Sequence, residues 1–344
     1  MLTSTLFLSG GIVLLWISAE GLVRGASALG RIAGVTPIVI GLTVVSIGTS
    51  APELVVSLLA AMQGNPDLAT GNVFGSNLAN IGLILGLAAV LRPLQVAGQV
   101  VKREVPWMIA VTLLVLPLMW NLRMGRVEGA ILAATLFVYL FFLLRLARSE
   151  GPSLTRGVLP DEPPAFGAAE PGKAAGGAQR GHDRGWGRPG GLRLLGFPIF
   201  LVVVGAVGLV VGGRGIVTGA RAMAAGYGIP EVIVGLSVIA VGTSLPELAT
   251  TVIAAVRREA DLAVGNIVGS NIFNLTFVLG GTALITPLEV HPILLRVEYP
   301  AMLLLSLFLL PLAWTRRALA RYEGLLLLAL YGGAWVWIIV MRGI

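Results

Sequence analysis

Two glutamates that lie within long apolar stretches are the residues of this chain best suited to chemistry. Glu53 ends the motif Gly-Thr-Ser-Ala-Pro-Glu, and Glu247 ends the motif Gly-Thr-Ser-Leu-Pro-Glu. A charged side chain at the centre of a membrane costs at least ~2.5–3.5 kcal/mol on insertion scales, so a carboxylate there calls for a functional explanation. The proline before each glutamate lacks an N–H and clashes with the carbonyl group four residues earlier. Each motif therefore predicts a kinked helix that frees backbone carbonyls beside a carboxylate.

Both glutamates belong to a sequence that occurs twice. Residues 41–54 return as 235–248, and residues 67–80 return as 261–274, each time 194 positions later and with 9 of 14 residues identical. The identities fall on Gly, Thr, Ser, Pro, Glu and Asn, whereas the aliphatic residues vary among Val, Ile and Leu. Packing alone would preserve shape and let polar residues change. The pattern therefore indicates a duplicated site.

Hydroxyl and amide side chains accompany each glutamate. In helical geometry Thr49 and Ser50 lie on the face of Glu53. The oxygen-bearing residues of the two copies are Thr49, Ser50, Ser76 and Asn80, with Thr243, Ser244, Ser270 and Asn274. For the serines and asparagines of the second block, hydrogen bonding between helices is the alternative to ion contact.

The chemistry of this set favours hard cations. The chain has no cysteine and the motifs contain no histidine, and ligation by oxygen alone suits Ca²⁺ or Na⁺ rather than Zn²⁺ or Cu²⁺. Two carboxylates balance one Ca²⁺, and without it they demand replacement ions or protons. This demand is a physical basis for ion exchange. We expect Ca²⁺ and Na⁺ as transported ions and no cofactor.

The composition places these motifs in membrane helices. The chain is 56% hydrophobic and 12% charged, with a mean hydropathy of +0.91. Apolar stretches long enough to cross a ~30 Å hydrocarbon layer recur along it. They cover 4–23, 36–62, 68–91, 105–121, 127–144, 194–213, 229–256, 262–285, 299–313 and 324–341. We predict an all-α integral membrane protein with about ten transmembrane helices.

A polar segment divides the chain into halves. Residues 148–193 are rich in Gly, Pro and charge, which predicts a disordered linker between a first five-helix repeat (1–147) and a second (194–344). Because five is odd, the second repeat inserts upside down, giving two inverted-topology repeats. Most of the 24 Lys and Arg residues then lie on the linker side, so the linker is predicted to be cytoplasmic, with both termini outside the cell membrane. The net charge of +7 reflects these loops, so membrane lipid is expected as a partner, without nucleic acid or an obligate protein.

Five other acidic residues receive simpler interpretations. Asp67 and Asp261 precede predicted helices and are expected to be N-caps. Glu104 and Glu298 open matched helices before a proline, which favours an interfacial or capping position. Glu20 lies near the inner end of the first helix, and because Arg214 occupies its place in the second repeat, no role is assigned to it.

The paired Gly-Thr-Ser-x-Pro-Glu and Gly-Ser-Asn-x-x-Asn blocks resemble the α-repeats of the sodium/calcium exchangers, in the cation/Ca²⁺ exchanger superfamily. The resemblance covers the whole chain except 148–193 and matches the prokaryotic type with two inverted repeats. It implies that the first and sixth helices slide across the rest to alternate access to a central site. The implied ligands are Glu53 and Glu247 for both ions, the carbonyls of Thr49 and Thr243 for Ca²⁺, and Ser50, Ser244, Ser76 and Ser270 for Na⁺, with Asn80 and Asn274 completing the centre.

Departures within the superfamily narrow the choice of ions. Some relatives carry Asp at the position of Asn274, a pattern of potassium-dependent exchangers, so potassium co-transport is not expected. Proton-coupled relatives usually show a Gly-Asn-x-x-Glu core. The motif here favours Na⁺ as the driving ion, with an H⁺/Ca²⁺ antiporter as the alternative.

The sequence also bears on two other classes of function. An intramembrane protease would need His-Glu-x-x-His or paired aspartates within the membrane, and the sequence has neither, so no enzyme is predicted. A Ca²⁺ channel would share the oxygen-rich centre but would not need an inverted duplication. Dependence of Ca²⁺ flux on a counter-ion separates a channel from an exchanger.

Overall fold

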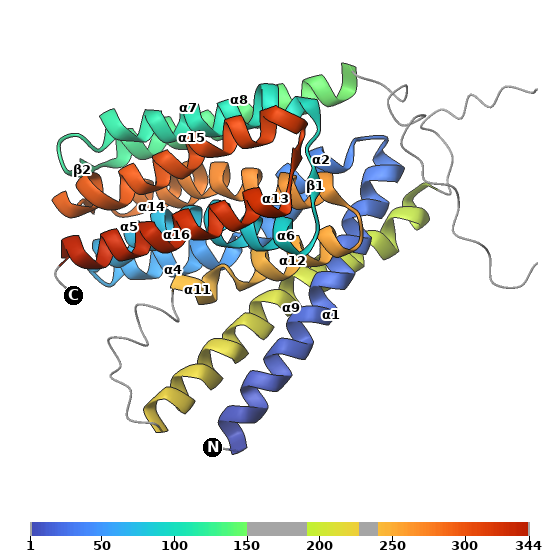
Figure 1. Cartoon of the computed structure of the whole chain (residues 1–344), viewed down its shortest axis with the longest axis horizontal. Helices are drawn as coiled ribbons and strands as arrows, with labels where there is room; N and C mark the ends of the chain where they lie inside the picture. The colour runs from blue at the N-terminus through green and yellow to red at the C-terminus, as the bar shows by residue number, and fades with distance from the viewer. Residues whose placement is uncertain (1, 150–190, 227–239, 343–344) are drawn as a thin grey trace, which may run out of the picture.

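The computed structural model describes residues 2–149, 191–226 and 240–342 (Figure 1). Helices, several of them interrupted by π-helical turns (η), make up nearly all of it. The first repeat contains α1 (Leu2–Ala33), α2 (Pro37–Ile40), η1 (Gly41–Val45), α3 (Ser46–Thr49), α4 (Ala51–Met62), α5 (Pro66–Ala79), η2 (Asn80–Leu85), α6 (Gly86–Leu91), β1 (Leu94–Gln95), η3 (Val100–Glu104), α7 (Val105–Leu118), β2 (Arg123–Met124) and α8 (Arg126–Ser149). The second contains α9 (Gly191–Gly226), α11 (Ala240–Thr243), α12 (Leu245–Val256), α13 (Ala260–Phe273), η6 (Asn274–Val278), α14 (Leu279–Ile285), β3 (Leu288–Glu289), η7 (Leu294–Glu298), α15 (Tyr299–Arg316), β4 (Ala318–Leu319) and α16 (Arg321–Arg342).

Seven helices of the described part are long and apolar enough to cross a membrane. They are Thr3–Ala33, Pro66–Leu91, Arg126–Leu146, Leu195–Ala220, Ala260–Ile285, Leu294–Arg316 and Arg321–Arg342. An eighth span forms if Pro37–Thr49 and Ala51–Met62 count as one helix bent by 43°, as the proline motif predicted. The total of about ten crossings stays a prediction, and the proposed disorder of the linker concerns residues that lie largely outside the described ranges.

The first helix is longer than its hydropathy predicted. The apolar stretch 4–23 stops before Arg24, but α1 continues to Ala33. A charged residue lowers the local hydropathy and so ends an apolar stretch, but it does not end a helix. Alanine and leucine, which follow Arg24, favour continued helix. The long α1 lies beside α9 (Figure 1). Glycines allow this close approach, since a Cβ added at Gly11 would lie 2.8 Å from the carbonyl oxygen of Gly212.

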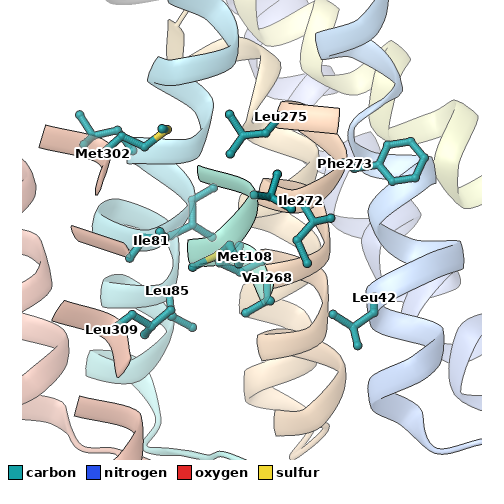
Figure 2. Close-up of a cluster of buried hydrophobic side chains, with 14 of the residues drawn as sticks. Leu42, Ile81, Leu85, Met108, Val268, Ile272, Phe273, Leu275, Met302 and Leu309 are labelled. Atoms are coloured by element: carbon teal, nitrogen blue, oxygen red, sulfur yellow. The ribbon is translucent and has the colours of Figure 1, made fainter. Parts of the chain in front are cut away.

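The core lies where the second block of each repeat meets the other. Every residue of α13 from Leu262 to Phe273 is buried. Figure 2 shows apolar side chains from both repeats packed around this helix. The labelled residues are Leu42, Ile81, Leu85, Met108, Val268, Ile272, Phe273, Leu275, Met302 and Leu309. On the outer helices, large apolar side chains such as Phe7 and Phe200 are exposed, as expected where hydrocarbon is the solvent.

Two short antiparallel pairs depart from the predicted all-α fold. Strand β1 pairs with β4, and β2 pairs with β3. The two pairs lie toward opposite ends of the helical bundle (Figure 1). In the repeat, β1 corresponds to β3, and β2 corresponds to β4 after the single inserted residue. Each pair therefore joins the two halves of the chain.

Candidate ion-binding centre

The two glutamates begin new helices rather than interrupting continuous ones. Helix α3 ends at Thr49, Ser50 adopts φ −83° and ψ 5°, and Glu53 lies in the first turn of α4. In the second repeat Ser244 adopts φ −86° and ψ 6°, and Glu247 lies in the first turn of α12. Both glutamates are 0% exposed. A helix N-terminus favours negative charge, so this break helps the fold tolerate each buried carboxylate.

Each glutamate accepts a hydrogen bond from the serine of the other repeat. Ser50 Oγ donates to Glu247 Oε1 at 3.1 Å, and Ser244 Oγ donates to Glu53 Oε1 at 3.4 Å. Each serine thus bonds the glutamate of the opposite repeat rather than the glutamate three residues later in its own repeat. The crossed pairing is reciprocal, as in the contact between two copies related by a two-fold axis. The structure thus brings both glutamates to one centre.

Two asparagines that the sequence analysis missed tie the hydroxyls together. Asn72 and Asn266 occupy the same place in the two repeats, and each bridges a threonine of the opposite repeat to a hydroxyl of its own. The bonds run from Thr243 Oγ1 to Asn72 Oδ1 (3.2 Å), Asn72 Nδ2 to Ser57 Oγ (2.9 Å), Thr49 Oγ1 to Asn266 Oδ1 (3.2 Å) and Asn266 Nδ2 to Thr251 Oγ1 (3.0 Å). Their identity in both blocks was the available clue.

A second pair of amides crosses the centre through π-helical turns. Asn80 begins η2 and Asn274 begins η6, so the same irregularity occurs in both repeats. Asn80 Nδ2 donates to Asn271 Oδ1 at 3.0 Å, and Asn274 Nδ2 donates to Asn77 Oδ1 at 3.1 Å. Such turns are frequent at functional sites, where they redirect side chains. The side-chain oxygens Oδ1 of Asn80 and Asn274 receive no hydrogen bond.

The centre contains buried acceptor oxygens that receive no hydrogen bond. They occur mostly in repeat-related pairs, and they are Glu53 Oε2, Glu247 Oε2, Asn80 Oδ1, Asn274 Oδ1 and Ser76 Oγ. Ser76 flanks Glu53, as Ser270 flanks Glu247, and Ser270 Oγ lies 3.5 Å from Thr49 Oγ1. A buried polar atom without a partner costs about 1–3 kcal/mol. The donor set fits a hard cation, which would satisfy these oxygens.

All ten residues named from the sequence are buried, and most are linked by the hydrogen bonds above. In the described part of the chain no three His, Cys, Asp or Glu residues cluster. A cation here would consequently rely on two carboxylates and on neutral oxygens. That limits the negative charge of the centre to two.

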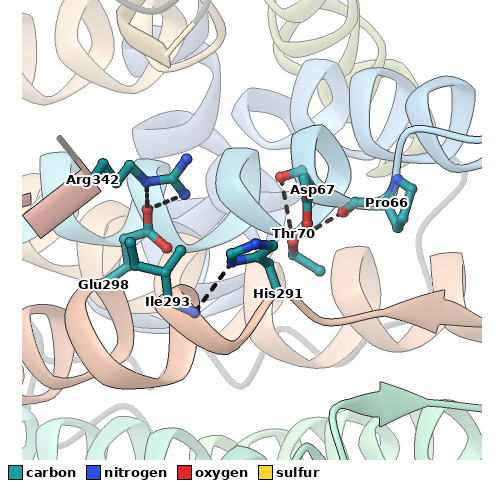
Figure 3. A network of polar contacts seen from close by, with 7 residues as sticks. All are labelled: Pro66, Asp67, Thr70, His291, Ile293, Glu298 and Arg342. Atoms are coloured by element: carbon teal, nitrogen blue, oxygen red, sulfur yellow. Dashed lines mark hydrogen bonds and ion pairs between the residues drawn. The ribbon is translucent and has the colours of Figure 1, made fainter. Parts of the chain in front are cut away.

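The aspartates expected to cap helices do not do so. Asn65 caps α5 through its side chain, while Asp67 lies inside the first turn. Figure 3 shows Asp67 beside Thr70, whose hydroxyl donates to the Asp67 carbonyl at 3.3 Å. Helix α13 begins after Glu259, and Asp261 again falls within the first turn. The capping prediction is wrong for both, because each helix starts before the aspartate.

The other matched glutamates, Glu104 and Glu298, form ion pairs at the starts of their helices. Glu104 is buried, pairs with Arg103 at 2.6 Å and accepts the Tyr139 hydroxyl at 2.7 Å. Its counterpart Glu298 pairs with Arg342 and thereby joins the start of α15 to the end of α16 (Figure 3). Glu104 and Glu298 occupy the N-cap positions of α7 and α15, as predicted, but neither side chain makes a capping hydrogen bond. Both carboxylates are neutralised away from the central site.

Comparison with known proteins identifies the class. The family model described as "Sodium/calcium exchanger protein" matches residues 3–145 and 197–340. The chain belongs to this family of membrane antiporters, as its motifs predicted.

Similar proteins extend along nearly the whole chain. The inner membrane protein YrbG of Escherichia coli K12 is 39% identical over 99% of this chain and 97% of its own length. The sodium/calcium exchanger MaX1 of Methanosarcina acetivorans is 34% identical, covering 93% of this chain and 94% of its own. A solved structure of the sodium-calcium exchanger NCX_Mj, soaked with 2.5 mM Na⁺ and 1 mM Sr²⁺, aligns with a TM-score of 0.79 at 26% identity over 98% of each chain.

Proposed function

We propose that this protein exchanges Ca²⁺ for Na⁺ across the cell membrane at the centre built on Glu53 and Glu247. The observation that carries the proposal is the reciprocal set of buried oxygens without hydrogen-bond donors. Two carboxylates supply the charge that balances one Ca²⁺, and the amide oxygens of Asn80 and Asn274 extend the set. The printed names of MaX1 and NCX_Mj, both sodium/calcium exchangers, support the same choice of ions.

Exchange follows from the cost of leaving the centre without a cation. Two carboxylates without a counter-charge in a medium of low dielectric constant repel each other and lose their hydration. Release of Ca²⁺ therefore favours the entry of other cations before the centre crosses to the other side. Coupling arises because the transition is easier for the neutralised centre than for the charged one.

Sodium is the ion that the neutral oxygens favour. Ser50 and Ser244 already donate hydrogen bonds to the glutamates of the opposite repeats. The lone pairs of their hydroxyl oxygens can coordinate a cation at the same time. Proton exchange would require little beyond the two carboxylates. An H⁺/Ca²⁺ antiporter remains the second candidate, because the superfamily contains proton-coupled members.

The proposed transport cycle places movement in α1 and α9. These helices correspond to the first and sixth crossings, and in the structure they pack against each other and lean away from the remaining bundle (Figure 1). We propose ten crossings in two inverted repeats, with the 148–193 linker in the cytoplasm and both termini outside. The opposite placement of the two strand pairs supports the inversion, since β1 and β3 are repeat counterparts.

The test uses purified protein in proteoliposomes with ⁴⁵Ca²⁺ outside. An outward Na⁺ gradient should drive Ca²⁺ uptake, and collapsing the gradient should stop it. An outward proton gradient in Na⁺-free buffer should drive little uptake, and K⁺ should change nothing. Robust uptake driven by protons alone would promote the second candidate. Uptake that needs no counter-ion would indicate a channel.

A further inference from the structure

The strand pairs at the two ends of the molecule share one backbone frame. Arg317 precedes β4 and has a φ of +49°, while its counterpart Leu122 precedes β2 and has a φ of +59°. The Arg317 carbonyl accepts the Val96 N–H at 2.8 Å, and the Leu122 carbonyl accepts the Val290 N–H at 2.9 Å. A left-handed backbone costs a residue with a Cβ roughly 1–2 kcal/mol. Duplication has kept this strained turn in both repeats.

The β1–β4 end builds a basic pocket on the frame. A cavity of about 200 Å³ is lined by Gly98, Val101, Lys102, Trp314 and Arg317. Lys102 and Arg317 are exposed, and neither forms an ion pair with any acidic residue in the described ranges. Gly98 lies against the guanidinium group, since a Cβ there would be 3.6 Å from Arg317 Nη1. The pocket therefore presents two cations that no carboxylate of the described residues neutralises.

The counterpart positions at the β2–β3 end carry different chemistry. They are Pro292, Leu295, Arg296, Met119 and Leu122. One cation is lost because leucine replaces arginine, and the aromatic residue is replaced by a fully buried methionine. Pro292 also takes the place of Gly98, the glycine that leaves room beside the guanidinium group of Arg317. Since the backbone frame is the same, the difference lies in the side chains that have been selected at one end.

The position of the pocket indicates where its ligand comes from. Trp314 is 58% exposed. It lies two residues before Arg316, which ends both α15 and a candidate membrane span. Exposed tryptophan is typical of the boundary between hydrocarbon and headgroups. Arg92 Nη1 donates to the Val256 carbonyl at 3.1 Å, which brings the basic end of α12, with Arg257, to the same side. This is the end predicted to face the cytoplasm.

We propose that Lys102 and Arg317 bind the phosphate group of an anionic lipid headgroup at this pocket. A guanidinium group can donate two parallel hydrogen bonds to a phosphate, and the lysine adds a second positive charge. Basic pockets at the ends of membrane helices bind such headgroups. A soluble phosphate would offer the same anion, but the pocket opens beside an exposed tryptophan at the end of a membrane span. The proposal requires only that the protein is a membrane protein, and it holds whichever ion is transported.

Native mass spectrometry of the full-length protein released from detergent micelles tests this assignment. With dioleoylphosphatidylglycerol added, the wild type should retain one lipid, and with dioleoylphosphatidylcholine it should retain at least fivefold less. Lys102→Gln and Arg317→Asn should each reduce phosphatidylglycerol retention at least fivefold, whereas Arg317→Lys should keep most of it. Asparagine tolerates positive φ, so Arg317→Asn removes the charge without disturbing the turn. Lys102→Gln lies outside the turn and tests the claim alone.

Arg296→Gln, at the opposite end, is the matched control and should leave retention unchanged. Wild-type retention in Lys102→Gln and Arg317→Asn would overturn the proposal, as would an equal loss in Arg296→Gln. Millimolar inorganic phosphate should not displace the lipid. Displacement by phosphate alone would assign the pocket to a soluble anion instead and would contradict the lipid site.

Discussion

The centre of the molecule and its two ends have responded differently to the same duplication. At the centre, hydrogen bonds recur in pairs 194 residues apart, from Ser50 with Glu247 to Ser244 with Glu53. At the ends, the backbone turn recurs, but the side chain differs: Arg317 in one repeat corresponds to Leu122 in the other. Both halves contribute side chains to the central site, so a function of that site constrains the same positions in both. The two ends of the bundle have different environments, so their side chains can differ. Symmetry thus marks the residues that the common function requires.

The same comparison separates hydroxyls within the centre. Thr250 is buried three residues after Glu247, and its Oγ1 has no hydrogen-bond partner. Its counterpart in the first repeat is Val56, so the position tolerates loss of the hydroxyl in one half. Ser50 and Ser244 are serine in both halves. We therefore propose the symmetric hydroxyls as ion ligands and leave Thr250 outside the set.

The largest expected effect comes from neutralising either glutamate. Glu53→Gln and Glu247→Gln should each lower Na⁺-driven ⁴⁵Ca²⁺ uptake by about 100-fold or more, because one remaining carboxylate cannot balance a divalent ion and an amide is a weaker ligand for it. The control is Glu289→Gln at the exposed position of strand β3, which should transport normally. A variant with near-normal uptake, or a large difference between the two variants, breaks the comparison.

A smaller effect is expected from the crossed serines. Ser50→Ala and Ser244→Ala should each raise the Na⁺ concentration for half-maximal exchange about fivefold and change Ca²⁺ affinity less than about twofold, since both charges remain. Thr250→Val, which copies the first repeat, should change neither value. Equal sensitivity of all three variants would show that symmetry does not mark the Na⁺ ligands. Initial rates at varied Na⁺ and Ca²⁺ provide the measurement.

The bridging asparagines should affect stability more than ion choice. Asn72→Ala removes the hydrogen bonds to Ser57 and Thr243, and Asn266→Ala removes those to Thr251 and Thr49. Ser57 and Thr49 keep hydrogen bonds to backbone carbonyls, so Thr243 and Thr251 are the groups left without partners. Each orphaned group costs about 1–3 kcal/mol, so both variants should melt at a lower temperature in detergent. Asn72 also donates to the Glu53 carbonyl at 3.3 Å, which makes its loss the larger one. A variant that melts like wild type would remove its asparagine from the network.

The smallest effect is expected where symmetry is already broken. Glu20 pairs with Arg24 at 2.7 Å and with Arg257 at the end of α12, but Arg214 occupies its counterpart position. Partly exposed pairs contribute about 0–1 kcal/mol and weaken with salt. Glu20→Gln should therefore lower the melting temperature slightly in dilute buffer and not at all in 0.5 M salt. A large, salt-independent loss would indicate a role in holding α1 in place.

Sequence alone could predict which polar residues lie at the centre but not their hydrogen-bond partners. The repeated Pro-Glu motifs identified both glutamates and the helix breaks, because polar identity within apolar stretches is visible in the letters. The helix break sends Ser50 to the other repeat, a relation between segments far apart in the chain. The π-helical turns at Asn80 and Asn274 likewise depend on tertiary packing. Asn72 and Asn266 were visible as identities, but their bridging role depends on the opposite repeat.

Calcium binding by the purified protein tests the central claim most directly. If Glu53 and Glu247 share one ion, isothermal titration in Na⁺-free buffer should give one Ca²⁺ per chain, and Glu53→Gln and Glu247→Gln should each abolish this binding. Two Ca²⁺ per chain, with one lost in each variant, would mean that every repeat holds its own ion. That result, or wild-type binding in either variant, would contradict a single centre shared by the two halves.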